Sequence, residues 1–123
     1  MRFLPSLLLA AACAAAFSAN AQSVQLVVQD SPLAGFRYGE GALLWPQLRE
    51  GDRLDLVRER ENPHDSNAVR VDWQGRKLGY VPRRENAALA WGLDRGTPLR
   101  ARISDLAEHP NPPRRVRFEV FVE

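Results

Sequence analysis

The strongest constraint on the fold is a strict alternation of apolar and polar residues near the C-terminal end of the chain. The apolar set occupies every second position: Val116, Phe118, Val120 and Val122. Charged residues at 115, 117 and 119 alternate with them. Successive side chains of a β-strand point to opposite faces, so a slip of one residue would expose the whole apolar set. The segment 116–122 is therefore predicted to be a strand with one buried face.

Earlier parts of the chain have the same β character. The segments predicted to form strands are 24–29, 53–58, 69–81 and 99–106. The first is closed by Asp30-Ser31-Pro32, a sequence typical of a turn. In 69–81 apolar residues again occupy alternate positions, and Gln74-Gly75 is placed to form the tight turn of a hairpin.

A change of period after Pro82 predicts a single helix over 86–93. The residues of its buried stripe follow helical spacing: Asn86, Leu89, Ala90 and Leu93. The segment 43–48 is ambiguous between a short strand and a helical turn, since Pro46 disfavours a long element of either kind. About five or six strands with one helix in roughly 100 residues predict a mainly β protein, a small OB- or SH3-like barrel.

The N-terminal segment 1–21 is predicted to be a signal peptide. A positive start at Met1-Arg2 precedes an apolar stretch, and Ala19-Asn20-Ala21 has the small-x-small pattern of a cleavage site. Cleavage after Ala21 leaves one domain, 22–123, in the periplasm or outside the cell, with no membrane span expected in it. The only cysteine, Cys13, lies in this leader, so no disulfide is expected; lipid modification of Cys13 is the alternative.

The charge balance excludes a polycationic protein. Without Arg2 the chain keeps 16 of its 17 basic side chains against 15 acidic ones. The segment 70–84 is nevertheless locally basic, with five cations against Asp72 alone, a net charge of +4. We expect this segment to give the domain a cationic face.

The most distinctive stretch is 56–93, LVRERENPHDSNAVRVDWQGRKLGYVPRRENAALAWGL. A predicted strand ending in Arg-Glu leads into the acidic turn Asn62-Pro63-His64-Asp65, and Asn67-Ala68-Val69 opens the next strand. Gly79-Tyr80-Val81-Pro82-Arg83 then precedes the helix, and Gly35-Phe36-Arg37-Tyr38 lies upstream. Taken together, these motifs cover most of the chain after the leader and resemble the HIRAN domain family.

The resemblance implies a modified OB-like barrel that, in its best-known members, recognises single-stranded DNA and holds a free 3′ end. In those members the module is joined to a remodelling-type ATPase. This sequence has no Walker-type GxxxxGK[ST] motif, so no ATPase activity is inferred. The nucleic-acid-binding positions that the resemblance implies are Arg37, Tyr38, Asn62, His64, Asp65, Tyr80 and Arg83. His64 is a departure, because tyrosine is usual there, so end recognition could be weaker or directed at another ligand.

The side-chain chemistry at these positions suits such a ligand. Single strands are held by flat aromatic faces for bases and by cations for phosphates. Tyr38, His64 and Tyr80 supply flat faces, and Arg37 and Arg83 supply cations. The carboxylate of Asp65 is an acceptor suited to a terminal hydroxyl group.

Purely structural explanations remain open at several positions. Asn62, Pro63 and Asp65 are also ordinary turn formers. Tyr80 could close the barrel with its hydroxyl in water. Trp91 falls opposite the buried stripe of the predicted helix, so it is either a partner contact or a residue lying across the barrel rim.

No catalytic, metal or cofactor site is expected. The two histidines, His64 and His109, have no zinc-ligand spacing, and the segment 109–113 is most simply a stiff proline-rich loop. The sequence therefore predicts a non-catalytic module that binds single-stranded nucleic acid. The alternative is an envelope module in which the same face is redirected to a protein, peptide or glycan partner.

Overall fold

The computed structural model describes residues 25–108 and 114–123. Its strands are β1 Leu26–Pro32, β2 Arg53–Glu59, β3 Ala68–Trp73, β4 Arg76–Tyr80, β5 Leu99–Glu108 and β6 Arg114–Val122. The helices are α1 Gly41–Leu44 and α2 Ala87–Asp94, and the 3-10 turns are η1 Phe36–Tyr38, η2 Trp45–Gln47 and η3 Arg83–Glu85. The predicted leader 1–21, its Cys13 and the loop 109–113 lie outside the described residues, so export stays a prediction.

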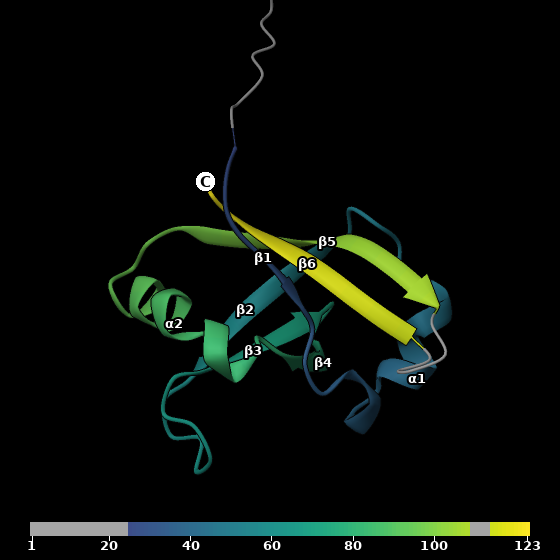
Figure 1. The fold of residues 1–123 in the computed structure, drawn as a ribbon, viewed down its shortest axis with the longest axis horizontal. Helices are drawn as coiled ribbons and strands as arrows, with labels where there is room; N and C mark the ends of the chain where they lie inside the picture. The colour runs from purple at the N-terminus through teal and green to yellow at the C-terminus, as the bar shows by residue number, and fades with distance from the viewer. Residues whose placement is uncertain (1–24, 109–113) are drawn as a thin grey trace, which may run out of the picture.

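The strands form a single antiparallel sheet in the order β1-β6-β5-β2-β3-β4 (Figure 1). The mainly β class is confirmed, but the predicted closed barrel is not what the described residues form. β1 and β4 share no ladder; a single bridge joins Ala34 to Tyr80, with N···O distances of 2.9 Å in both directions. Gly35 follows at once with a φ of 73°, which turns the chain away into η1. The two edges of the sheet are therefore joined by this one bridge, and no continuous ladder closes the sheet into a barrel.

The predicted strand faces supply one apolar core. Val116, Phe118 and Val120 are buried, and Val69 and Val71 from the central hairpin meet them in the same cluster. The tight turn of that hairpin is confirmed. Gln74 and Gly75 have φ values of 49° and 79°, the positive pair that a type I′ turn requires.

The first strand extends further than the sequence predicted. Asp30-Ser31-Pro32, expected to be a turn, continues β1 and pairs with β6 as far as Arg117. Pro32 is tolerated because β1 is an edge strand, where a missing N–H breaks no second ladder. Ser31 is fully buried and donates a hydrogen bond to Glu85 Oε1 at 2.7 Å, which ties this strand end to η3.

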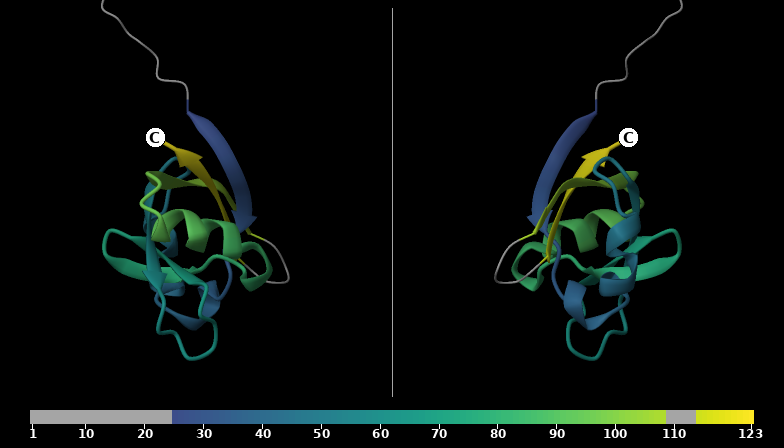
Figure 2. Two further views of the ribbon diagram at one scale, coloured as in Figure 1. Left: turned by 90° about the vertical axis from the view of Figure 1, so that its left-hand side faces the viewer. Right: turned by 90° about the vertical axis from the view of Figure 1, so that its right-hand side faces the viewer.

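The ambiguous segment 43–48 is helical, since it contributes the end of α1 and η2. The predicted helix is confirmed as α2, with Asn86, Leu89 and Ala90 buried and Trp91 exposed. No helix in the described part of the chain is long and apolar enough to cross a membrane. The β2–β3 turn lies at the end of the molecule opposite the C-terminus, and η1 and α1 lie toward that same end (Figures 1 and 2).

Candidate functional site

The predicted site residues are carried by four segments. Asn62, His64 and Asp65 lie in the turn between β2 and β3, and Tyr80 ends β4. Arg83 begins η3, while Arg37 and Tyr38 belong to η1. Ala34, just before η1, is hydrogen-bonded to Tyr80, and a Cβ placed on Gly39, just after η1, would lie 3.7 Å from the carbonyl oxygen of Lys77. The segment carrying Arg37 and Tyr38 therefore runs beside β4.

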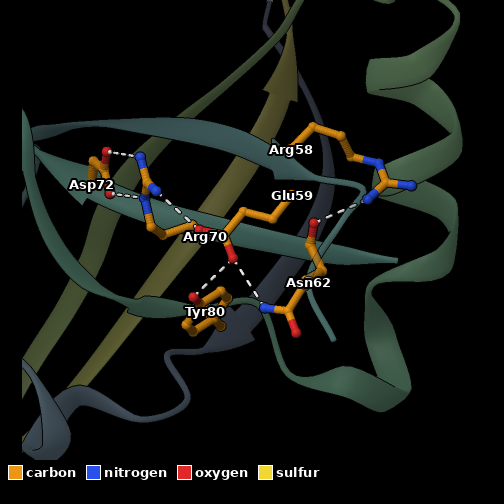
Figure 3. Close-up of polar contacts among 7 residues, drawn as sticks. Arg58, Glu59, Asn62, Arg70, Asp72 and Tyr80 are labelled. Carbon is orange, nitrogen blue, oxygen red and sulfur yellow. Dashed lines mark hydrogen bonds and ion pairs between the residues drawn. The ribbon is translucent and has the colours of Figure 1, made fainter. Parts of the chain in front are cut away.

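Glu59, the last residue of β2, organises the centre of this region (Figure 3). Its Oε1 accepts hydrogen bonds from the Tyr80 hydroxyl at 2.9 Å and from Asn62 Nδ2 at 3.0 Å. Its Oε2 accepts from Arg70 Nη1 at 2.9 Å, and Arg70 also makes a bidentate pair with Asp72. Residues of two strands and of the turn are thus fixed to one carboxylate.

This network sets the protonation of Glu59. Partial burial raises the pKa of the Glu59 carboxyl, but the hydrogen bonds from Asn62, Tyr80 and Arg70 outweigh it, and the net pKa is lowered from 4.5. The carboxylate is therefore ionised at neutral pH and keeps all three donors. The structural alternative for Tyr80 was wrong in one respect: its hydroxyl is bonded to Glu59 rather than standing free in water.

Asp65 connects the turn to the helix. Its Oδ1 accepts from the backbone N–H of Asn67 at 2.9 Å, and its Oδ2 accepts from Asn86 Nδ2 at 2.7 Å. The bond from Asn67 is the main reason that the pKa of Asp65 is lowered from 3.8; desolvation opposes it, and the Asn86 bond and the nearby Arg83 charge add to it. Asn62 Oδ1 likewise accepts from the backbone N–H of His64. The turn-forming role considered for Asn62 and Asp65 is confirmed.

The other site residues project outward. Tyr38 is 78% exposed, and its hydroxyl accepts a hydrogen bond from Arg37 Nη2 at 2.8 Å. His64 and Arg83 are also exposed, and neither side chain makes a hydrogen bond or ion pair within the described residues. Lys77 Nζ stands 4.7 Å from the centre of the Tyr80 ring, covering one of its faces. Flat faces and cations are thus available to a ligand at this end.

Two separate concave surfaces each include some of the predicted residues. One, of about 1000 Å³, is lined by Arg37 and Tyr38 of η1 together with residues of β5 and β6. The other, of about 660 Å³, is lined by Asn62, Glu59 and the end of α2. The structure therefore brings the predicted residues to one end of the molecule, but it does not line a single cavity with all of them.

The expected cationic face is smaller than the sequence suggested. Arg70 is paired with Glu59 and Asp72, and Arg76 is paired with Glu40. Counting Glu59 and Glu40 lowers the local net charge of 70–84 from +4 to +2. The prediction failed because both neutralising carboxylates come from elsewhere in the chain.

Several cations without a carboxylate partner lie on the segments that carry the predicted site or adjoin it. Ion pairs hold the arginines at 53, 58, 60, 70, 76, 100, 102 and 117. No carboxylate of the described residues pairs with Arg37, Lys77, Arg83, Arg84 or Arg95. These five lie on η1, on β4 and along the segment from η3 to the end of α2. Arg49, before β2, and Arg114, at the start of β6, likewise pair with no carboxylate of the described residues.

Sequence reasoning missed Glu59 and Asn86 as supports of the site. Glu59 stood in the Arg-Glu motif, but its partners at 70 and 80 meet only because β3 pairs with both β2 and β4. Asn86 was assigned to the helix stripe without a partner for its amide. In the described part of the chain, no three His, Cys, Asp or Glu side chains gather in a way that could hold a metal ion.

The fold and the site define a small mainly β domain with exposed aromatic and cationic side chains at one end. The family model for the HIRAN domain matches residues 26–123, so the chain belongs to the HIRAN domain family. This confirms the resemblance found in the sequence. HIRAN domains are nucleic-acid-binding modules.

Three similar proteins extend this assignment. The HIRAN domain of human HLTF superposes with a TM-score of 0.63 at 19% identity, over 80% of this chain and 78% of that one. A protein from Lactobacillus plantarum superposes with a TM-score of 0.66 at 26% identity, over 81% of this chain and 98% of that one. A Fanconi-associated nuclease 1 homolog from Oryza sativa subsp. japonica is 36% identical over 73 residues, which are 56% of this chain and 7% of that protein. The chain thus matches only a small part of the nuclease.

Proposed function

We propose that this domain is a non-catalytic module that binds single-stranded nucleic acid and prefers a free 3′ end. One observation carries the proposal: five cations without carboxylate partners in the described residues, Arg37, Lys77, Arg83, Arg84 and Arg95, lie on the segments that carry the motif residues of the family or directly adjoin them. Elsewhere on the sheet, most arginines are already neutralised by ion pairs. A polyanion gains the most electrostatic free energy from cations that have no carboxylate partner in the protein.

The roles follow from how each side chain is held. Tyr38 and His64 offer exposed ring faces to bases, and Arg37 and Arg83 offer charge to phosphates. Tyr80 contributes the ring face that Lys77 does not cover, with its orientation fixed by Glu59. Each oxygen of Asp65 keeps a free lone pair beyond its internal bond, which suits a terminal hydroxyl.

The test is a titration of the purified protein with labelled oligonucleotides that carry either a free or a blocked 3′ hydroxyl. We expect tighter binding of the free end at low salt. With two or three phosphates neutralised, the affinity should fall with salt at a log-log slope of about −1.5 to −2. Equal binding of both oligonucleotides would remove end recognition and leave the cationic surface, whereas no binding of either would overturn the proposal.

A pair of arginine variants makes the titration specific to this end of the domain. Arg37→Ala removes a cation of η1, and Arg53→Ala removes an equal charge from an exposed ion pair on β2. We expect Arg37→Ala alone to weaken binding and to make the salt slope shallower by about 0.7, the value for one single-strand phosphate contact. Equal effects of the two variants would mean that only the net charge matters.

Export belongs to the proposal as well. If the leader is cleaved after Ala21, the available ligand is extracellular or incoming DNA rather than a chromosomal end. No contact or comparison favours the envelope protein, peptide or glycan partner that the sequence left open. That alternative gains support only if both oligonucleotides fail to bind.

A further inference from the structure

The outer face of α2 is not explained by the packing of the domain. Trp91 is 62% exposed, although the helix residues on either side of it, Ala90 and Gly92, are buried. Trp91 is absent from the core cluster and from the partly buried residues packed against it, which include Trp45 and Leu93. Ala87 and Ala88, one turn earlier, are exposed as well, so nothing bulky shields the ring on that side.

Arg95 holds the indole in a defined arrangement. Its guanidinium carbon lies 3.8 Å from the centre of the Trp91 ring, one helical turn further along the chain. The guanidinium covers one ring face, and from the 62% exposure of the residue we infer that the other face is accessible. Proteins that bind single-stranded nucleic acid combine flat aromatic faces with cations in the same way.

The charge on this face is not neutralised. Asp94 is the nearest carboxylate in sequence, but Arg58 and Arg60 of the β2 end already pair with it at 3.0 Å. No carboxylate of the described residues pairs with Arg84 or Arg95. The face between η3 and the end of α2 therefore combines an aromatic ring with two cations.

This face continues directly from the candidate site. Arg84 follows Arg83 in η3, and Ala88, Trp91 and Arg95 recur at the spacing of one face of α2. Arg83 and Trp91 are eight residues apart along η3 and α2, so the rise of 3-10 and α helices limits their separation along the chain to about 16 Å. A strand bound at Arg83 can reach Trp91 by extending over a few nucleotides.

We propose that Arg84, Trp91 and Arg95 form a second contact surface for the same single strand, which we name the α2 surface. A base stacks on the open face of Trp91, and the two arginines contact the phosphates that flank it. The α2 surface binds nucleotides 5′ to the one held at the candidate site and recognises no particular base, because every base has a flat face. This inference rests on the proposed function, since it requires a strand bound at the neighbouring site.

The test compares two oligonucleotides that share a free 3′ hydroxyl and differ in length, of about four and about twelve nucleotides, the range of site sizes in such modules. We expect wild type to bind the longer one more tightly. Trp91→Ala should weaken the longer one by at least about five-fold, the low end for loss of one stacked base, and leave the shorter one unchanged. Leu26→Ala is the control, because Leu26 is 64% exposed on β1, the strand at the far edge of the sheet.

Fluorescence gives a second measurement. The chain has three tryptophans; Trp73 is buried and Trp45 is partly buried, so Trp91 dominates the response to a ligand. The longer oligonucleotide should quench wild type, and Trp91→Phe should lose the quenching while it keeps most of the affinity through a smaller ring. If Trp91→Ala binds the longer oligonucleotide as tightly as wild type does, the stacking role of Trp91 is overturned.

The failures of the two proposals are distinguishable. If Tyr38→Ala weakens both oligonucleotides and Trp91→Ala weakens neither, the α2 surface is wrong and the proposed function stands. If wild type binds neither oligonucleotide at low salt, the proposed function fails and the α2 surface fails with it. If Trp91→Ala weakens both lengths equally, Trp91 belongs to the first site and the separate surface is overturned.

Discussion

The two parts of the candidate site differ in how firmly the fold holds their side chains. In the β2–β3 turn and β4, Asn62, Asp65 and Tyr80 are each hydrogen-bonded to a neighbouring segment. In η1, Arg37 and Tyr38 are exposed, and within the described residues their side chains hydrogen-bond only to each other. The β2–β3 turn and β4 therefore contribute a fixed shape, while η1 contributes side chains that a ligand would have to order.

This contrast has a consequence for every substitution. A side chain that is fixed before binding loses little conformational entropy when the ligand arrives, so it favours affinity, but its removal also disturbs the fold. An exposed side chain can be removed with little effect on stability. Changes in the turn and β4 therefore alter stability and affinity together, whereas changes in η1 report on affinity alone.

The largest expected effect follows from removing the carboxylate that joins the fixed part. Glu59→Ala leaves Tyr80 and Asn62 without their shared acceptor, so we expect a loss of about 2 kcal/mol in the free energy of unfolding. Asp55→Ala is the matched control on the same strand, because Asp55 pairs with Arg53 at the surface and should cost less than about 0.5 kcal/mol. Denaturant unfolding measures both, and equal losses would mean that Glu59 is an ordinary surface carboxylate.

The exposed part should behave in the opposite way. Tyr38→Ala should weaken oligonucleotide binding by about 1 to 3 kcal/mol if its ring stacks on a base. Its free energy of unfolding should stay within about 0.5 kcal/mol of wild type, because the ring is outside the core. Binding titration and denaturant unfolding of the same preparation separate the two. A large loss of stability with unchanged affinity would place Tyr38 in the structural part instead.

The sequence predicted the elements that depend on local pattern. Alternation located β2, β5, β6 and the central hairpin, because a buried strand face imposes a period of two on the residues themselves. The helix stripe was found for the same reason. The end of β1 was missed, since Asp30-Ser31-Pro32 forms a strand only because β6 pairs with it.

The polar architecture of the site depends on contacts between distant segments. Motif positions supplied the candidate residues, yet no spacing indicated that Glu59 would bind Tyr80, 21 positions away, or that Asp65 would bind Asn86. The net charge of 70–84 was overestimated for the same reason. Its neutralising partners are Glu40, which follows η1, and Glu59, which ends β2. Side-chain partners are set by strand register and packing, which the chain reveals only when folded.

Acid should destabilise the fixed part. The folded pKa of Glu59 lies below 4.5 and that of Asp65 below 3.8, so both carboxylates contribute stability that is fully present above those ordinary values. That contribution is lost as the pH falls below about 4.5 toward the folded pKa values, because protonation removes the acceptors. Glu59→Gln should show a shallower loss of stability over the same interval. Parallel curves for variant and wild type in thermal unfolding would contradict the assignment of acid sensitivity to Glu59.

The smallest expected effect concerns His64. Its backbone belongs to the fixed β2–β3 turn, but its side chain is exposed like those of Arg37 and Tyr38. Its backbone N–H donates to Asn62 Oδ1, while its exposed ring makes no hydrogen bond or ion pair with the residues that the structure describes. His64→Tyr should leave stability unchanged and raise affinity by less than about 1.5 kcal/mol, the gain from a larger stacking face. Ser66→Tyr, which adds the same ring at another exposed position of that turn, is the control. A gain in His64→Tyr alone would show that the rigid turn aims position 64 at the ligand, whereas equal gains would mean that any added aromatic at this end suffices.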